Sequence, residues 1–235
     1  APFTRVVIDA GHGGKDEGAT SANGIREKEL VLDVAQRLGK LLEREKLSVI
    51  LTRDSDHFVP LEVRTSRAND ARGDLFVSIH ANAARVKRAR GIETYFVSLE
   101  ASDAAAGNLA DRENEALGQG RAASRAVDPF LALLGDMINT DHMAESNAFA
   151  KLAQAELARV DKTSSRGVKQ APFVVLMGVQ MPAALIEIGF LSNNDDAASL
   201  RNSSHRENIA KALASAVVAF GKRYDARRGL ALRSN

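Results

Sequence analysis

The sequence of 235 residues contains no cysteine. This absence excludes thiolate metal ligands, a cysteine nucleophile and disulfide bonds. No apolar run is long enough to span a bilayer, and no signal peptide precedes the first apolar run, so we expect a mature or trimmed segment. Aromatic residues make up only 5% of the chain, and they do not interleave with a basic stripe of the kind that binds nucleic acid.

The charge balance also gives no sign of a nucleic-acid partner. The formal net charge is only +2. The densest basic run, residues 85–90, is better interpreted as a solvated loop than as a site for an anionic polymer. With 45% hydrophobic and 26% charged residues, the composition is typical of a soluble globular protein, and the length suits one large domain or two small ones.

Apolar runs alternate with helical patterns along most of the chain. In residues 27–45, for example, Leu30, Val34 and Leu38 recur at helical spacing and form one apolar face. Such alternation predicts an α/β fold with a mostly parallel central sheet of about six strands and helices on both faces. We expect strands at residues 5–9, 48–52, 75–79, 92–97, 174–177 and 183–188, and helices at residues 27–45, 61–71, 104–117, 145–160 and 206–224.

Residues 101–141 interrupt this alternation. The segment is longer than an ordinary connection between a strand and a helix. It contains the predicted helix 104–117 and a second apolar cluster at residues 130–138. An insertion of this kind is usually a lid or a docking site, although simple packing onto the domain explains it equally well.

Two histidines occupy equivalent places, each directly after a run of apolar β-formers. His12 follows the first predicted strand in a glycine-rich loop, and His80 follows the strand 75–79. Ligands of open α/β sheets bind outside the carboxyl ends of the strands, so we expect a metal site there. A catalytic zinc site takes three ligands from His, Asp or Glu. Glu27, at the start of the following helix, is the best third candidate, and Glu29 is the neighbouring alternative.

A carboxylate also ends the last predicted strand. Glu187 follows four apolar residues, an expensive place for a charge unless something holds it there. A proton-shuttle role is reasonable at that edge, and a salt bridge at the strand end is an equally good interpretation of Glu187 alone. The other three histidines, His57, His142 and His205, lack the strand-end context and are interpreted as surface residues.

Four segments together resemble a known family. These are Asp-Ala-Gly-His-Gly-Gly-Lys-Asp at residues 9–16, Arg-Glu-Lys-Glu at 26–29, Ser-Ile-His-Ala-Asn at 78–82 and Glu-Ile-Gly-Phe-Leu-Ser-Asn at 187–193. In this order, over about residues 6–220, they resemble the zinc-dependent N-acetylmuramoyl-L-alanine amidases. More narrowly, they are similar to the catalytic domain of the bacterial cell-separation amidases.

The resemblance implies a single αβα domain with one zinc ion. By motif, His12, Glu27 and His80 match the zinc ligands and Glu187 matches the catalytic glutamate. The implied reaction is hydrolysis of the amide between N-acetylmuramic acid and L-alanine of peptidoglycan, in the periplasm of a Gram-negative bacterium. We expect a catalytic domain at residues 1–225, a regulatory insertion at about 101–144 and a tail at 226–235.

The resemblance also implies regulation. Some cell-separation amidases hold a helix across the active site until an activator protein removes it, and a glutamate of that helix can bind the zinc. Residues 112–116 align with that helix, where Glu113 is the matching position and Glu115 the neighbouring alternative. We therefore expect a monomer inhibited by its own insertion, with an activator docking on the insertion at residues 130–138.

Two other functions are compatible with the metal site alone. One is a zinc hydrolase of another amide, such as a peptidase or a deacetylase. The other is a non-catalytic wall-binding module, which would tolerate loss of Glu187, whereas an enzyme would not.

Overall fold

The computed structural model describes residues 2–84, 86–115, 140–160 and 165–229. Its strands are β1 Arg5–Ala10, β2 Ser48–Leu51, β3 Leu75–Asn82, β4 Ile92–Val97, β5 Ser165–Ala171 and β6 Ala183–Phe190. Its helices are α1 Glu27–Arg44, α2 Leu61–Asp70, α3 Ala104–Asn114, α5 Thr140–Val160, α6 Val174–Met177, α7 Asn194–Arg201 and α8 Ser203–Arg227. Within these described ranges, no helix combines the length and apolarity needed to cross a bilayer.

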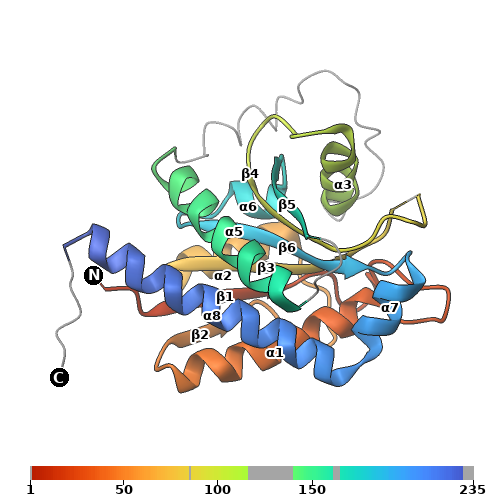
Figure 1. Cartoon of the computed structure of the whole chain (residues 1–235). Helices are drawn as coiled ribbons and strands as arrows, with labels where there is room; N and C mark the ends of the chain where they lie inside the picture. Colours follow the sequence, from red (N-terminus) through yellow and green to blue (C-terminus); the bar gives the residue numbers. More distant parts are fainter. Residues whose placement is uncertain (1, 85, 116–139, 161–164, 230–235) are drawn as a thin grey trace.

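The six strands form one sheet in the order β2-β1-β3-β6-β4-β5 (Figure 1). Strands β2, β1, β3 and β6 are parallel. Strand β4 pairs antiparallel with β6 and parallel with β5, so the last two strands run in the opposite direction. The predicted α/β fold with a mostly parallel sheet is confirmed. The carboxyl ends of β1, β3 and β6 therefore lie next to one another at one edge.

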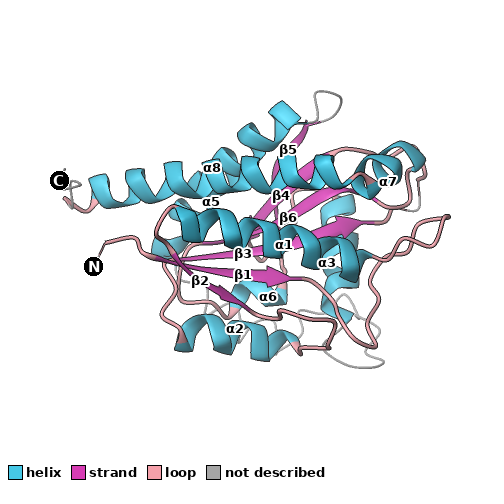
Figure 2. Ribbon diagram, turned by 90° about the horizontal axis from the view of Figure 1, so that it is seen from below, coloured by secondary structure: helices cyan, strands magenta, loops and turns pink. Residues whose placement is uncertain are grey.

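Helices cover both faces of the sheet (Figure 2). On one face, α1, α5 and α8 bury apolar side chains such as Leu38, Phe149 and Phe220 against β1, β3 and β6. On the other face, α2, α3 and α6 pack against the same sheet through a smaller cluster that includes Leu109 and Phe173. Burial of a strand on both faces explains why β3 and β6 are apolar over most of their length.

One expected strand is wrong, and one strand of the sheet was not predicted. Residues 174–177 form the short helix α6, not a strand, because four consecutive apolar residues suit a buried helical turn as well as a buried strand. The strand that completes the sheet is β5, whose sequence Ser-Arg-Gly-Val-Lys-Gln-Ala is mostly polar because β5 lies at the edge of the sheet. The apolar cluster predicted at residues 130–138 lies outside the described residues.

Candidate metal centre

Three neighbouring strands place candidate site residues at one edge of the sheet. His12 lies two residues beyond the end of β1, while His80 and Glu187 lie in the carboxyl-terminal halves of β3 and β6. His80 and Glu187 are direct partners in the parallel pairing. Strand β3 continues three residues further than predicted, so His80 is part of the sheet rather than of the loop after it. Glu187 lies within β6, as predicted, and β6 continues two residues further than expected.

The loop after β1 fixes the orientation of the His12 ring. Nδ1 of His12 lies 2.9 Å from an Asp16 carboxylate oxygen, which leaves Nε2 to face the site. Metal-binding histidines are usually oriented in this way by a carboxylate on the other ring nitrogen. Gly11 makes room for the second imidazole: a Cβ atom at Gly11 would lie 2.4 Å from the His80 ring. The two rings meet edge to face, with their centroids 4.9 Å apart.

Glu27 is the first residue of α1 and its carboxylate is fixed on both oxygens. Oε2 accepts a hydrogen bond from the Ala19 amide at 2.7 Å, and Oε1 accepts one from the Ala81 amide at 2.8 Å. Oε1 also lies 3.2 Å from Nε2 of His12 and 3.1 Å from Nδ1 of His80. The alternative candidate, Glu29, is exposed and pairs with Arg26.

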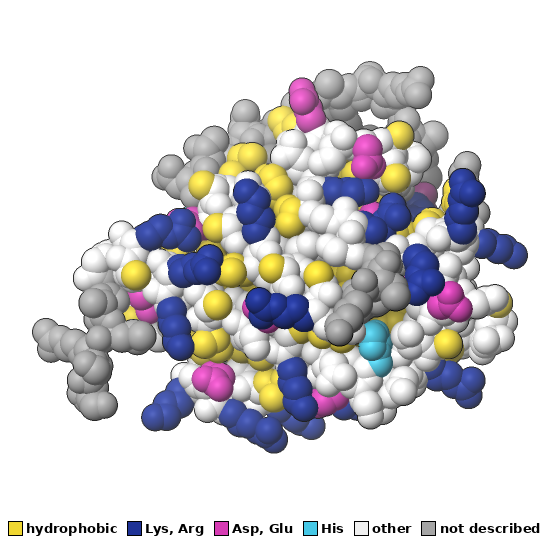
Figure 3. Space-filling view, in the orientation of Figure 1, with side chains coloured by type: hydrophobic (Ala, Val, Ile, Leu, Met, Phe, Trp, Pro, Cys, Tyr) yellow, Lys and Arg dark blue, Asp and Glu magenta, His cyan; other side chains and the backbone are white. Residues whose placement is uncertain are grey.

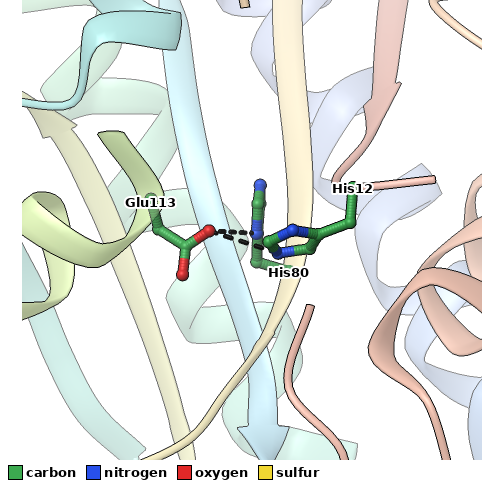
Figure 4. A group of neighbouring side chains, drawn as sticks. All are labelled: His12, His80 and Glu113. Carbon is green, nitrogen blue, oxygen red and sulfur yellow. Dashed lines mark ion pairs between the residues drawn. The ribbon is translucent and has the colours of Figure 1, made fainter. Parts of the chain in front are cut away.

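Helix α3 brings a second carboxylate to the same two rings. Glu113 Oε2 lies 3.2 Å from Nε2 of His12 and 3.1 Å from Nδ1 of His80 (Figure 4). Its side chain is only 12% exposed, whereas Glu115, two residues further along, is exposed. The structure therefore places Glu113, and not Glu115, against the histidines.

The donor atoms fit a tetrahedral metal ion. His12, His80 and Glu113 offer ligand atoms that all lie within 4.8 Å of one another. Oε1 of Glu27, which contacts both rings, is a fourth candidate ligand atom. The four contacts between rings and carboxylates measure 3.1 or 3.2 Å. A tetrahedral zinc site with ligand bonds of ~2.0 Å has edges of about 3.3 Å. Nε2 of His12 and Oε2 of Glu113 are buried without a hydrogen-bond partner among the described residues.

The charged groups of the site shift one another's pKa values strongly. Burial lowers the pKa of His80, but the carboxylates of Glu113 and Glu27 outweigh burial and raise that pKa to about 10. Burial raises the pKa of Glu113, but the two imidazoles outweigh it and lower that pKa to about 2. Two carboxylates therefore face the two ring nitrogens at short range, an arrangement that stabilises a cation between them, whether a proton or a metal ion.

Glu187 differs from the other two site carboxylates. It is fully buried, and neither of its oxygens has a hydrogen-bond partner among the described residues. Burial raises its pKa well above the usual range, and His80 does not offset the combined effect of burial and the neighbouring acids. Glu93, which pairs with Glu187 from the neighbouring strand β4, instead has its charge balanced by Arg166 and Lys169. A carboxyl group without a hydrogen-bond partner, paired across the strands with His80, is suited to accepting and releasing a proton.

A cleft of about 520 Å³ opens beside the four donor atoms. Its walls include His12, Glu27, Glu113, Lys15, Phe58 and Arg112. Lysine and arginine side chains are scattered over the face shown in Figure 3 and do not gather in one patch.

Two further residues, Asp16 and Arg112, hold this site together, although neither was among the predicted site residues. Asp16 orients His12, and its place four residues further along the same motif was the available signal. Arg112 donates to Oδ1 of Asn82 at 2.8 Å and to the Ala83 carbonyl, which ties α3 to the end of β3. No pattern in the sequence marks that contact. The donor group formed by the described residues contains none of the other three histidines.

Known proteins resemble this chain over most of its length. A family model described as N-acetylmuramoyl-L-alanine amidase matches residues 6–219. The amidase AmiC of Escherichia coli is 34% identical over 220 residues, which cover 92% of this chain and 52% of AmiC. The amidase AmiA of Escherichia coli is 34% identical over 224 residues, which cover 94% of this chain and 77% of AmiA. The chain therefore spans about half the length of AmiC.

A solved structure shares the fold. The catalytic domain of CwlV, an N-acetylmuramoyl-L-alanine amidase from Bacillus (Paenibacillus) polymyxa, superposes with a TM-score of 0.71 at 28% sequence identity. The superposition covers 92% of this chain and 97% of that domain.

Proposed function

The chain belongs to the N-acetylmuramoyl-L-alanine amidase family, and we propose that it hydrolyses the amide bond between N-acetylmuramic acid and L-alanine of peptidoglycan. This reaction frees the stem peptide from the glycan strand. The observation that carries the proposal is the convergence of His12, Glu27 and His80 next to a fully buried Glu187. A non-catalytic wall-binding module has no need for that arrangement.

His12, Glu27 and His80 would hold one zinc ion. When bound, zinc polarises a carbonyl and makes water a stronger nucleophile at neutral pH. Asp16 holds the His12 ring in place, and the amides of Ala19 and Ala81 hold the Glu27 carboxylate. These contacts fix the ligand atoms on the rigid edge of the sheet.

Glu187 would act as the general base and then the general acid. Both of its oxygens lack a hydrogen-bond partner among the described residues, so both are available to the reacting groups. The carboxylate takes a proton from the attacking water and passes it to the leaving alanine nitrogen. An amide requires this second transfer because without it the nitrogen would have to leave as an amide anion, whereas after it a neutral amine leaves.

Helix α3 would inhibit the enzyme in this conformation. Glu113 occupies the position that substrate and water need, facing the same ring nitrogens as Glu27. Glu187 has no exposed surface, so a substrate can reach it only after a neighbouring part of the site moves. Both observations support a closed state.

Side-chain contacts at both ends of α3 would hold it closed. At its carboxyl end, Asn114 donates to the Pro172 carbonyl and accepts from the Val174 amide, both at 2.9 Å. At its amino end, Asp103 forms a 3.1 Å ion pair with Lys169. A partner that binds the insertion better when α3 is displaced would shift the equilibrium towards the open state. We propose that an activator protein is this partner, with residues 130–138 as its docking segment.

Cell separation and wall remodelling in the periplasm are the proposed context. The similarity to AmiC and AmiA of Escherichia coli supports it. In this proposal residues 1–225 form one monomeric catalytic domain, residues 101–144 its regulatory insertion and residues 226–235 a tail.

Digestion of purified peptidoglycan sacculi tests the reaction. The amidase releases stem peptides with a free L-alanine amino group and leaves the glycan strands intact. A peptidase would release peptides cut internally, and a deacetylase would release acetate; either product would replace the proposed activity. The Glu187→Gln variant serves as the control for contaminating hydrolases. The Glu113→Ala variant provides an enzyme that does not depend on an activator.

A further inference from the structure

Two buried arginines contact the loop that carries His12. Arg53 and Arg64 are 1% and 2% exposed, although arginine is rarely buried unless its charge and its donors are satisfied. Here four of their eight hydrogen bonds reach backbone carbonyl groups of one short segment, residues 10–12. Both guanidinium groups therefore act on the loop that carries His12.

Arg64 binds this loop on both sides of Gly11. Its Nη1 donates to the Ala10 carbonyl and its Nη2 to the His12 carbonyl, both at 2.7 Å. Its Nε donates to the Val59 carbonyl at 2.9 Å, which anchors the guanidinium beside the amino end of α2. The loop is thus held against a fixed, planar fork of donors.

Arg53 joins the loop to the helix that carries Glu27. Its Nε donates to the Ala10 carbonyl at 2.9 Å. A single nitrogen, Nη2, then donates to the Gly11 carbonyl and to the Lys28 carbonyl, both at 2.8 Å. Gly11 directly precedes His12, and Lys28 directly follows Glu27. One guanidinium group therefore links the two segments that supply these side chains.

The backbone of His12 needs this support. Its φ angle is +58°, in the left-handed region that residues with a side chain rarely adopt. The hydrogen bond from Arg64 to the His12 carbonyl holds that conformation, and the charge of Arg64 is balanced by a 2.9 Å ion pair with buried Asp9. Asp9 in turn accepts hydrogen bonds from Thr52 and Ser78. The network thus reaches from the loop into β3.

We infer that Arg53 and Arg64 are positioning residues of the metal centre: they hold the His12 and Glu27 segments at their mutual distance before the metal arrives. The inference rests on the proposed function, because it assumes that zinc binds to His12 and Glu27. Lysine cannot replace either arginine, since one ammonium group cannot span three carbonyl groups in a fixed plane.

The test compares Arg53→Lys and Arg64→Lys with a matched control. Arg206→Lys alters an arginine that also donates to two backbone carbonyl groups, those of Leu200 and Arg201, and pairs with an aspartate, but on the opposite face of the sheet. The zinc dissociation constant is measured by competition with a chelator, and the unfolding midpoint is measured on the metal-free protein. We expect zinc binding to weaken about 10- to 100-fold in Arg53→Lys and Arg64→Lys, and to remain unchanged in Arg206→Lys.

Two outcomes overturn the inference. The first is a parental zinc affinity in the two variants. The second is a loss that Arg206→Lys reproduces at an equal drop in unfolding midpoint, because the effect would then be one of general stability. If Arg64→Lys does not fold, Arg53→Lys decides the question, because that variant leaves the ion pair between Arg64 and Asp9 intact.

Hydrogen exchange on the metal-free parent tests the same inference without any substitution. The Gly11 and Gly13 amides, which donate to Ile79 and Asp16 carbonyl groups, should be protected as strongly as those of β1. Rapid exchange that slows only when zinc is added would mean that the metal, not the arginines, orders the loop. A parent that binds no zinc, or a His80→Ala variant that binds it normally, would instead refute the proposed function.

Discussion

The two glutamates that face the histidine rings are held in very different ways. Glu27 and Glu113 both lie 3.1 Å from His80 and 3.2 Å from His12. Yet the Glu27 carboxylate accepts two backbone hydrogen bonds, and Glu27 is the first residue of α1, a helix with nine buried residues. Glu113 lies on α3, which has three buried residues, Ala106, Leu109 and Ala110. Equal distances thus accompany unequal support: the Glu27 carboxylate starts from a deeply buried helix, whereas Glu113 lies on a helix with few buried residues, which suits its withdrawal in the proposed function.

This difference follows from how much apolar surface each helix buries. Burying a large aliphatic side chain contributes about 1.5–3 kcal/mol, and an alanine contributes far less. Helix α1 contributes Leu30, Val31, Val34, Leu38 and Leu42 to the main core. Helix α3 has only Leu109 as a large buried side chain. Releasing α3 therefore costs a small fraction of what releasing α1 would cost, as a switch requires.

The largest expected effect is the loss of the fixed carboxylate. Glu27→Gln should reduce both zinc content and hydrolysis of sacculi to background, because a neutral amide replaces an anionic ligand. Glu29→Gln, which alters the exposed neighbour, should leave both unchanged. Zinc content by elemental analysis and release of stem peptides are the two measurements. Stoichiometric zinc in Glu27→Gln would show that this carboxylate is not a ligand.

A second large effect concerns the network beneath His12. Burial raises the pKa of Asp9, but Arg64 and the hydrogen bonds from Thr52 and Arg64 outweigh it, and the pKa falls below the usual 3.8. The stabilisation from ionised Asp9 is therefore complete above about pH 4 and is lost as the pH falls through the folded-state pKa. Asp9→Asn should lower the free energy of unfolding by about 3 kcal/mol at neutral pH, because it leaves a buried arginine unpaired.

The pH dependence separates this effect from a general loss of packing. The difference in unfolding free energy between the parent and Asp9→Asn should stay constant from pH 7 to about pH 5 and shrink below about pH 4. Asp33→Asn, which alters a partly exposed aspartate paired with Arg37 and Arg206, should cost about 1 kcal/mol or less. A difference that grows on acidification would contradict the assignment.

Glu187 belongs to the fixed part of the site but should not hold the metal. Glu187→Gln should retain zinc and fold normally while turnover falls by about 100-fold or more, the usual scale for a lost acid–base group. The assay uses the Glu113→Ala background, so that both proteins are open. Loss of zinc would make Glu187 a ligand, and near-parental turnover would remove it from catalysis.

Removal of the second carboxylate, that of Glu113, should raise activity rather than lower it. Glu113→Ala should raise basal hydrolysis of sacculi about 10-fold without any activator, because it removes the group that competes with water and substrate. Glu115→Ala provides the matched control on the same helix end and should not change the basal rate. Equal rates in the parent, Glu113→Ala and Glu115→Ala would exclude α3 as an inhibitory element.

The sequence predicts the fixed part of the site better than the movable part. Apolar strands with a polar residue at their carboxyl end led directly to His12, His80 and Glu187, because burial on both faces leaves a strong local signal. Glu113 has no such signal. It lies on a helix of ordinary composition, and only the resemblance to a family pointed to it.

Long-range contacts and edge strands escaped the sequence analysis for physical reasons. Nothing in the sequence marks Arg53 and Arg64 as buried, because most arginines are exposed and their carbonyl partners in residues 10–12 lie more than 40 residues away. Strand β5 is mostly polar because it lies at the edge of the sheet, and α6 is too short to show a helical period. Local patterns cannot report what only the assembled sheet brings together.

The smallest expected effect, and the sharpest test of the comparison, concerns the attachment of α3. Asn114 and Asn69 make matching contacts on either side of α6: each side chain donates to one backbone carbonyl and accepts from a backbone amide two residues later. Asn114 joins α3 to the amino end of α6, whereas Asn69 joins α2 to the segment just after α6. Replacing either with alanine removes two hydrogen bonds of ordinary strength, so both variants should lose similar stability, about 1–2 kcal/mol.

Only Asn114→Ala should change activity, because only α3 covers the metal centre. A weakened contact of that size, shared between opening and unfolding, should raise basal hydrolysis of sacculi about threefold. Asn69→Ala should leave the rate unchanged at the same loss of unfolding midpoint, since α2 belongs to the part of the fold that stays in place. If both variants gain activity equally, α3 opens through general loosening of the domain. In that case the inequality between the supports of Glu27 and Glu113 does not control access to the site.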